Sequence, residues 1–159
     1  FQTNLTYSAQ RSVLRMIPGL EKAEFLRFGQ MHRNTFLNAP RLLRSSLQHR
    51  ERDDLLFAGQ ITGVEGYLGN LATGLLAGVN AARIGQGADP LVMPAETMLG
   101  SLCNYVSKAD AKTFQPMKAN FGIVPPLEDG FRRKRRERAQ AFADRSAQKM
   151  AEFWPKHNE

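Results

Sequence analysis

Residues 57–67, FAGQITGVEGY, carry glycines at positions 59, 63 and 66 between an apolar run and a pattern typical of a helix. Glycine adopts positive φ angles and lets another group approach the backbone closely. The run before them, LLFAG (55–59), shows no polar alternation, which is typical of a strand buried on both faces of a parallel sheet. The stretch therefore predicts a buried strand, a glycine turn and a helix.

The predicted helix runs from Tyr67 to about Ile84, and Gly85 and Gly87 supply its stop. It is rich in glycine and alanine, and each glycine inside a helix costs about 1 kcal/mol relative to alanine. We therefore expect it to lie close to a sheet or to a ligand. A helix N-terminus at the carboxyl edge of a sheet attracts negative charge. The glycine spacing is not GxGxxG, so a tight connection without a ligand stays open.

Weaker patterns cover the rest of the chain. We expect a helix that starts near Ser8, and strands over 25–29 and 35–37. A strand or short helix over 41–52 should precede a turn at Asp53-Asp54, and a second helix should cover 95–107. The segment 108–130 is predicted to be a proline-rich ordered loop, followed by a helix over 131–154. The positions in this last helix that we expect to pack are Phe131, Ala139, Phe142, Ala143, Met150 and Phe153.

The composition, with 42% apolar residues in 159, is typical of one folded domain. A single cysteine, Cys103, excludes a disulfide within the chain, and we expect it to be a packed helix residue. The histidines and Cys103 lack metal-ligand spacing, so no metal is expected. The most apolar stretch, around 68–82, is too short and polar to cross a bilayer, and we see no signal peptide. A cytoplasmic protein is the default expectation.

The net charge is +7, and most of it falls within residues 132–138. Six cations surround one acid, Glu137, in this run. Such a cluster predicts a polyanionic partner, nucleic acid first, although a solvated helix face has the same pattern. The candidate nucleic-acid-binding residues are Arg132, Arg133, Lys134, Arg135, Arg136 and Arg138. Four further cations are candidates to extend the patch: Arg11, Arg15, Lys118 and Arg145.

Six segments, in chain order, resemble one protein family. They read FQTNLTYSAQRSVLRMIPGLEKAEFLRFG, MHRNTFLNAP, LLFAGQITGVEGY, ATGLLAGVNAAR, MLGSLCNYV and FQPMKANFGIVPPL. The family is that of the bacterial folate- and FAD-dependent tRNA (uracil-5-)-methyltransferases, and the glycine turn also resembles a related flavoprotein that modifies wobble uridines. Members are longer, and this chain resembles their C-terminal third. One departure is Gly69-Asn70, where many members have Glu-Ser.

The resemblance implies an α/β fold: the C-terminal part of a Rossmann-like FAD-binding domain, with part of an inserted α+β domain and a basic C-terminal helix. Residues 1–40 would end the inserted domain and return to the FAD domain. Residues 41–107 would hold the strand, glycine turn and two helices, and residues 108–159 the loop and the basic helix. The turn that binds the ADP half of FAD, and the catalytic cysteines, would lie upstream, so no catalytic role is carried onto Cys103.

The activity implied is methylation of C5 of the T-loop uridine, position 54, in tRNA. Methylenetetrahydrofolate would supply the carbon, FAD would carry it, and NADPH or NADH would re-reduce the flavin. The tRNA T-arm would contact the cation run. The resemblance assigns FAD to Gly59, Gln60, Gly63, Val64, Glu65, Gly66 and Tyr67, and folate or substrate to His32, Arg33 and Asn34.

Some roles stay open. Tyr67 either stacks on a ring or packs, and Phe121 with Pro125-Pro126 either contacts the flavin region or braces the C-terminal helix. We expect the isolated chain to be inactive. Two alternatives remain: a fragment that only binds RNA or a partner, and another FAD oxidoreductase of the same sheet type.

Overall fold

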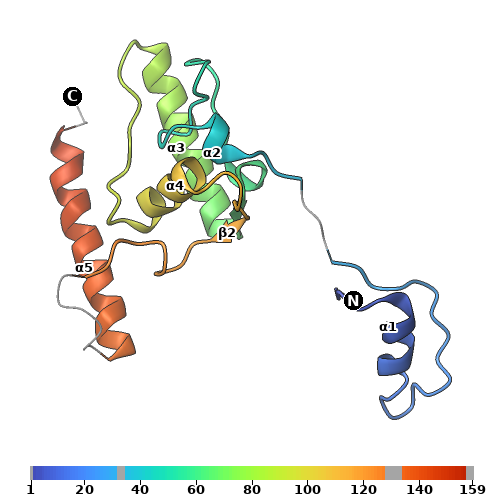
Figure 1. Ribbon diagram of the computed structural model, residues 1–159. Coiled ribbons are helices and arrows are strands. Elements are labelled where there is room, and N and C mark those ends of the chain that lie inside the picture. Colours follow the sequence, from blue (N-terminus) through green and yellow to red (C-terminus); the bar gives the residue numbers. More distant parts are fainter. Residues whose placement is uncertain (1, 32–34, 128–133, 157–159) are drawn as a thin grey trace. The chain divides into compact units, whose positions relative to one another are not determined.

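The computed structural model describes residues 2–31, 35–127 and 134–156 (Figure 1). The chain divides into two compact units, residues 1–34 and 35–159. Each unit is held together by its own contacts, and they are considered in turn.

The first unit is built around helix α1 (Tyr7–Leu14). Its N-cap is Thr6 and not Ser8, because the Thr6 hydroxyl accepts a hydrogen bond from the N–H of Ala9 at 3.3 Å. The buried side chain of Gln10, in α1, binds the backbone of the segment that packs against this helix, at Gly29. Its amide nitrogen donates to the Gly29 carbonyl at 2.9 Å, and its oxygen accepts from the Gly29 N–H at 2.8 Å.

The strand predicted over residues 25–29 is wrong, because these residues form no ladder. The ring of Phe28 stacks on those of Tyr7 and Phe25, at centroid distances of 5.0 and 5.4 Å. The Gln10 side chain forms hydrogen bonds with both the N–H and the carbonyl of Gly29. A strand needs a neighbouring backbone for those groups, and here a side chain replaces it.

The second unit is mixed helix and strand, with helix predominating. Its elements are α2 (Ala39–Leu42), the 3-10 helix η1 (Gly59–Thr62), β1 (Val64–Glu65), α3 (Tyr67–Gly85), α4 (Met98–Lys108), β2 (Met117–Lys118), α5 (Arg135–Phe153) and the 3-10 helix η3 (Trp154–Lys156). Strands β1 and β2 are parallel, with Val64 opposite Met117. They form the only sheet within the described residues.

Two more predicted strands, 35–37 and 55–59, are also wrong. Residues 55–58 are extended and half-buried, and Leu56 makes a single bridge with Gln48. The N–H of Phe57 donates to the Leu47 carbonyl at 3.0 Å. The strand of this region is instead β1, which lies within the glycine turn, between Gly63 and Gly66, and pairs with β2 from more than fifty residues later. The predicted turn at Asp53-Asp54 is confirmed.

The three longer helices of the second unit lie close to their predicted positions. Helix α3 ends at Gly85, followed by Gly87 at φ +76°. The N–H of Ala88 reaches back to the Arg83 carbonyl at 2.8 Å, which caps the helix in the manner of a Schellman motif. Helix α4 begins after Thr97, whose hydroxyl accepts from the Gly100 N–H at 3.0 Å. The end of α3 and the start of α4 are therefore set by hydrogen bonds between residues close in sequence.

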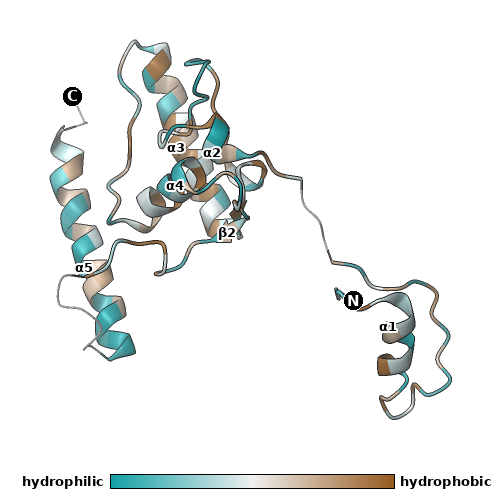
Figure 2. Cartoon of the chain, viewed as in Figure 1, coloured by the Kyte–Doolittle hydropathy of each residue, from teal (hydrophilic) through white to brown (hydrophobic). Residues whose placement is uncertain are grey.

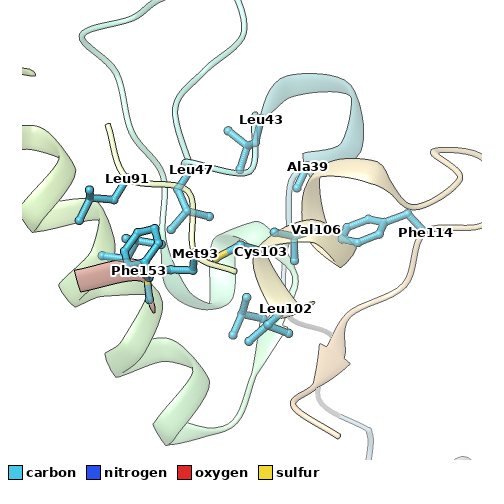
Figure 3. Close-up of a cluster of buried hydrophobic side chains, with 12 residues drawn as sticks. Ala39, Leu43, Leu47, Leu91, Met93, Leu102, Cys103, Val106, Phe114 and Phe153 are labelled. Carbon is cyan, nitrogen blue, oxygen red and sulfur yellow. The ribbon is translucent and has the colours of Figure 1, made fainter. Parts of the chain in front are cut away.

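The core of the second unit lies between α2, α3 and α4 and is shown in Figure 3. Its most buried large side chains include Leu43, Leu47, Leu102 and Val106. Helix α5 joins the core through Phe153, and Phe142 is buried as well. Ala143, predicted to pack, is exposed. Phe131 lies outside the described residues.

Asn80 ties the middle of α3 to two loops. Its side chain is fully buried and donates to the carbonyls of Ser46 and Leu91, both at 3.0 Å. Its oxygen accepts from the Leu91 N–H at 2.6 Å. A buried amide with all these partners stabilises the fold, and its loss leaves several backbone groups unpaired.

We therefore expect Asn80→Ala to lower the free energy of unfolding of the chain by about 2–4 kcal/mol, measured by urea denaturation. Asn120→Ala is the matched control, because the Asn120 side chain makes only local bonds at the surface. Its expected cost is below about 1 kcal/mol. Equal losses in the two variants would contradict this role for Asn80.

Candidate functional site

The glycine turn runs from η1 through β1 to the start of α3. Gly59, Gly63 and Gly66 have φ angles of +73°, +84° and +88°. Residues other than glycine rarely adopt such φ angles, so the three glycines determine the backbone path of the turn. The glycine turn predicted from the sequence is confirmed.

The inner side of the turn is buried and fixed by distant residues. A β-carbon at Gly63 would lie 2.6 Å from the ring of Phe114, and the Gly63 carbonyl accepts from the Met117 N–H at 2.9 Å. Thr62 and Val64 are fully buried. The backbone of the turn therefore has little freedom to shift.

The first two turns of α3 contact the backbone and side chains of the glycine turn. Thr73 donates its hydroxyl to the Gly69 carbonyl at 2.8 Å and accepts from the Gly59 N–H at 3.1 Å. A β-carbon at Gly69 would lie 2.8 Å from Val64 Cγ1 and 3.3 Å from Leu102 Cδ2. Glycine at position 69 thus serves close packing of α3 on β1 and α4.

The outer side of the turn is open to solvent. Gln60 and Gly66 are exposed, and the Tyr67 side chain is 89% exposed, so in this chain it does not pack. Gly66 is the N-cap of α3 and provides no capping side chain. The first N–H groups of a helix lack acceptors inside it and carry the positive end of its dipole. The arrangement suits an anionic or hydrogen-bond-accepting group.

Asn70 adds an unsatisfied acceptor behind the turn. Its side-chain oxygen is buried and has no hydrogen-bond partner, and it lies 3.5 Å from the position of a β-carbon on Gly59. Buried polar atoms without partners are rare in folded proteins. The Asn70 oxygen is therefore an unsatisfied polar atom packed against the backbone of the turn.

The cation run begins the last helix. Lys134, Arg135 and Arg136 are exposed, and Arg138 is half-buried. Arg132 and Arg133 lie outside the described residues. Cations at a helix N-terminus oppose the helix dipole, and Glu137 in the same turn partly offsets them, its carboxylate accepting from the Lys134 N–H at 3.2 Å. The stability of α5 does not explain this charge placement, which suits a polyanion.

Arg145, one of the predicted extensions of the patch, makes contacts within the chain. Arg145 donates to the Pro125 and Pro126 carbonyls and lies over the Phe142 ring at 5.3 Å. Phe121 stacks on Phe142 at 5.0 Å. This loop therefore braces α5, which is the second of its two predicted roles.

In the first unit, Arg11 and Arg15 lie over the rings of Phe28 and Phe25. Lys118, in β2, is exposed. Of the four predicted extensions, Lys118 alone makes no ring or carbonyl contact of this kind within the described residues.

The candidate folate residues His32, Arg33 and Asn34 lie outside the described residues. The segment that leads to them borders an open cleft of about 1020 Å³ in the first unit. Leu5, Tyr7, Arg27, Phe28 and Met31 are among its lining residues. The cleft mixes aromatic and polar side chains.

Cys103 is buried in α4, and burial raises the pKa of its thiol to about 12. Since the thiolate is the reactive form, this cysteine is inert at neutral pH, as the sequence predicted for a packed residue. Within the described residues, no group of acidic, histidine or cysteine side chains is arranged to hold a metal ion. The helices described here are all too short or too polar to cross a bilayer.

Sequence reasoning missed three residues of the site: Asn70 as an unpaired acceptor, Thr73 as the link to Gly59, and Phe114 as the ring against Gly63. Thr73 is four residues from Gly69 and so shares its helix face, a signal that was present in the sequence. Phe114 comes from a loop far along the chain and had no local signal.

Comparison with known proteins matches residues 1–89 to the family model described as glucose inhibited division protein A. The matched region includes the glycine turn and all of α3, and excludes α4 and α5.

Full-length relatives extend the similarity over most of the chain. Methylenetetrahydrofolate–tRNA-(uracil-5-)-methyltransferase TrmFO of Bacillus cereus (strain G9842) is 54% identical over 153 residues. Proteins of the same name from Bacillus cytotoxicus and Bacillus mycoides are each 53% identical. In all three the match covers 96% of this chain and 35% of the relative. The chain thus spans about a third of the length of these relatives.

We expect Gly63→Ala to lower the free energy of unfolding by about 2–4 kcal/mol, from backbone strain at positive φ and overlap with Phe114. The control is Gly74→Ala, a helix-interior position where a β-carbon meets nothing within 4 Å. That variant should raise stability by up to about 1 kcal/mol. Chemical denaturation of both variants checks the pair, and a Gly63 variant as stable as the parent would refute the account of the turn.

Proposed function

The chain belongs to the glucose inhibited division protein A family, and from this premise we propose that it is part of an enzyme that methylates C5 of uridine in tRNA. The family is one of FAD-binding proteins with a Rossmann-like fold. The names of the Bacillus relatives state a methylenetetrahydrofolate-dependent tRNA (uracil-5-)-methyltransferase. The chain would act as the portion of that enzyme that completes its flavin site and contacts RNA.

The observation that carries the proposal is the glycine turn at the start of α3. Its inner side is fixed by Phe114 and Thr73, while its outer side and the helix N-terminus are open. The exposed backbone at Gln60 and Gly66 and the uncapped N-terminus of α3 fit a flat ring system with hydrogen-bonding edges. The residues that would hold FAD are Gly59, Gln60, Gly63, Val64, Glu65, Gly66 and Tyr67.

When bound, FAD supplies electron transfer and one-carbon carriage, which protein side chains do not provide. The role of this chain is positioning and electrostatics. The N–H groups at the start of α3 would donate to the acceptor edge of the ring, and the helix dipole would favour negative charge there. The exposed Tyr67 ring is available to stack on a flat ligand.

The other components of the reaction follow the same proposal. His32, Arg33 and Asn34 would bind methylenetetrahydrofolate or substrate, and NADPH or NADH would be the reductant. The target would be the T-loop uridine, position 54. The nucleophile would come from outside this chain, because Cys103 is buried with a pKa of about 12. An enzyme of this kind acts on tRNA in the cytoplasm.

The exposed cations at the start of α5 would contact phosphates of the tRNA T-arm. Phosphate contacts position a nucleic acid without reading its sequence, and they weaken as salt rises. The brace formed by Arg145, Phe121 and Phe142 would hold α5 steady for this contact.

The proposal is tested with the complete product of the gene that encodes this chain. We expect the purified protein to carry flavin absorbance and to form 5-methyluridine in tRNA only when methylenetetrahydrofolate and a reduced nicotinamide are supplied. The 159-residue chain alone should form none. Flavin without uridine methylation would favour another oxidoreductase, and RNA binding without flavin would favour a binding fragment.

The RNA contact is tested by replacing Lys134, Arg135 and Arg136 with glutamine in that protein. We expect weaker T-arm binding and a slope of log affinity against log salt that falls by about 2–3. The control removes the same charge at Arg41, Lys108 and Lys112, which are exposed elsewhere. Gel-shift titration over a salt series measures both, and equal slopes would exclude the start of α5 as the contact.

A further inference from the structure

Helix α3 presents two faces, an inner one covered by the described residues and an outer one that they leave exposed. The inner face carries Gly69, Thr73, Leu76 and Asn80, all buried. The outer face carries Leu68, Leu71, Leu75 and Val79, which are 82%, 70%, 72% and 38% exposed. Both sets recur every three or four residues, so each is a continuous stripe.

The composition of α3 is that of a helix buried on all sides. Arg83 is its only charged residue, whereas α5 is largely hydrophilic along its length (Figure 2). A surface helix of a soluble protein normally presents charged residues opposite its buried stripe. Exposed large apolar stripes of this kind mark interaction sites.

Two glycines give an independent indication. A β-carbon at Gly74 or Gly78 would meet nothing within 4 Å, unlike one at Gly69. Nothing among the described residues therefore requires glycine at these two positions, although glycine weakens a helix interior. Both lie beside the outer stripe, where a closely approaching backbone would explain them.

We propose that the outer face of α3, formed by Leu68, Leu71, Leu75 and Val79, is the docking surface for the Rossmann-like flavin-binding part of the longer family polypeptide. About two thirds of each Bacillus relative lies outside its match to this chain. The parallel pair β1–β2 has two residues per strand. Parallel sheets are usually larger and covered on both faces, so a pair this short fits a sheet that the rest of the longer polypeptide would complete.

The alternative occupant is a second copy of this chain. A stable dimer buries roughly 800 Å² on each partner, and four aliphatic side chains supply roughly half of that. Segments of one polypeptide need less area, because the connection keeps them at high effective concentration. The covalently linked domain is therefore the occupant that this face fits. The inference rests on family membership and not on the methyl-transfer proposal.

The experiment is thiol labelling of Leu75→Cys by a maleimide, in the 159-residue chain and in the complete gene product. Leu75 is 72% exposed, so the substitution leaves the fold of the chain intact. The native Cys103 is buried and provides an unreactive background. Lys112→Cys, at an exposed loop position, is the control. Peptide mapping by mass spectrometry reads each site.

We expect Leu75→Cys to react in the isolated chain at the rate of Lys112→Cys, and at least about tenfold more slowly in the complete protein. The control should react equally in both. Equal labelling of Leu75→Cys in the two proteins, or a gene product no longer than this chain, overturns the proposal. Concentration-dependent protection in the isolated chain also overturns it, in favour of a second copy. Because no activity is read, the result is independent of whether the enzyme methylates RNA.

Discussion

The close approach of α3 to β1 and α4 at Gly69 is the constraint on which the second unit depends. With no side chain at this position, Val64 Cγ1 and Leu102 Cδ2 fill the space that a β-carbon would take. That contact brings Thr73 within reach of the Gly59 N–H, at 3.1 Å. The packing of α3 therefore fixes the position of the glycine turn. Farther along the same face, Asn80 fixes two loops to the helix.

Stability and function are separated within these elements. The inner side of the turn is buried, with the Asn70 oxygen behind it unpaired, while its outer side carries exposed residues. The same holds for α5, where Phe142 and Phe153 pack and the first turn carries cations that oppose the helix dipole. Residues that do not stabilise the folded chain, or that destabilise a helix, therefore lie at the proposed flavin and RNA contacts. Proteins commonly violate local rules at functional sites.

The helices were predictable, and the strands were not. Helix α3 ends where Gly85 and Gly87 predicted, because a helix is held by hydrogen bonds between residues four apart and stopped by local chemistry. The strand predicted over 55–59 failed, because a ladder needs a second backbone whose position is not encoded nearby. The strand that does form, β1, pairs with β2, which lies in the proline-rich segment predicted as a loop. Likewise the ring of Phe114 reaches Gly63 from fifty residues away.

The sequence by itself determined the positive-φ turn, the extent of α3, the burial of Cys103 and the run of cations, since each follows from residue type and short-range spacing. It also indicated, through resemblance, the family that the comparison with known proteins then established. The tertiary structure decided which glycines serve packing and which do not. A β-carbon at Gly63 or Gly69 would overlap neighbouring side chains, while one at Gly74 or Gly78 would meet no atom within 4 Å. That distinction depends on side chains brought together from distant segments, and spacing along a helix does not contain it.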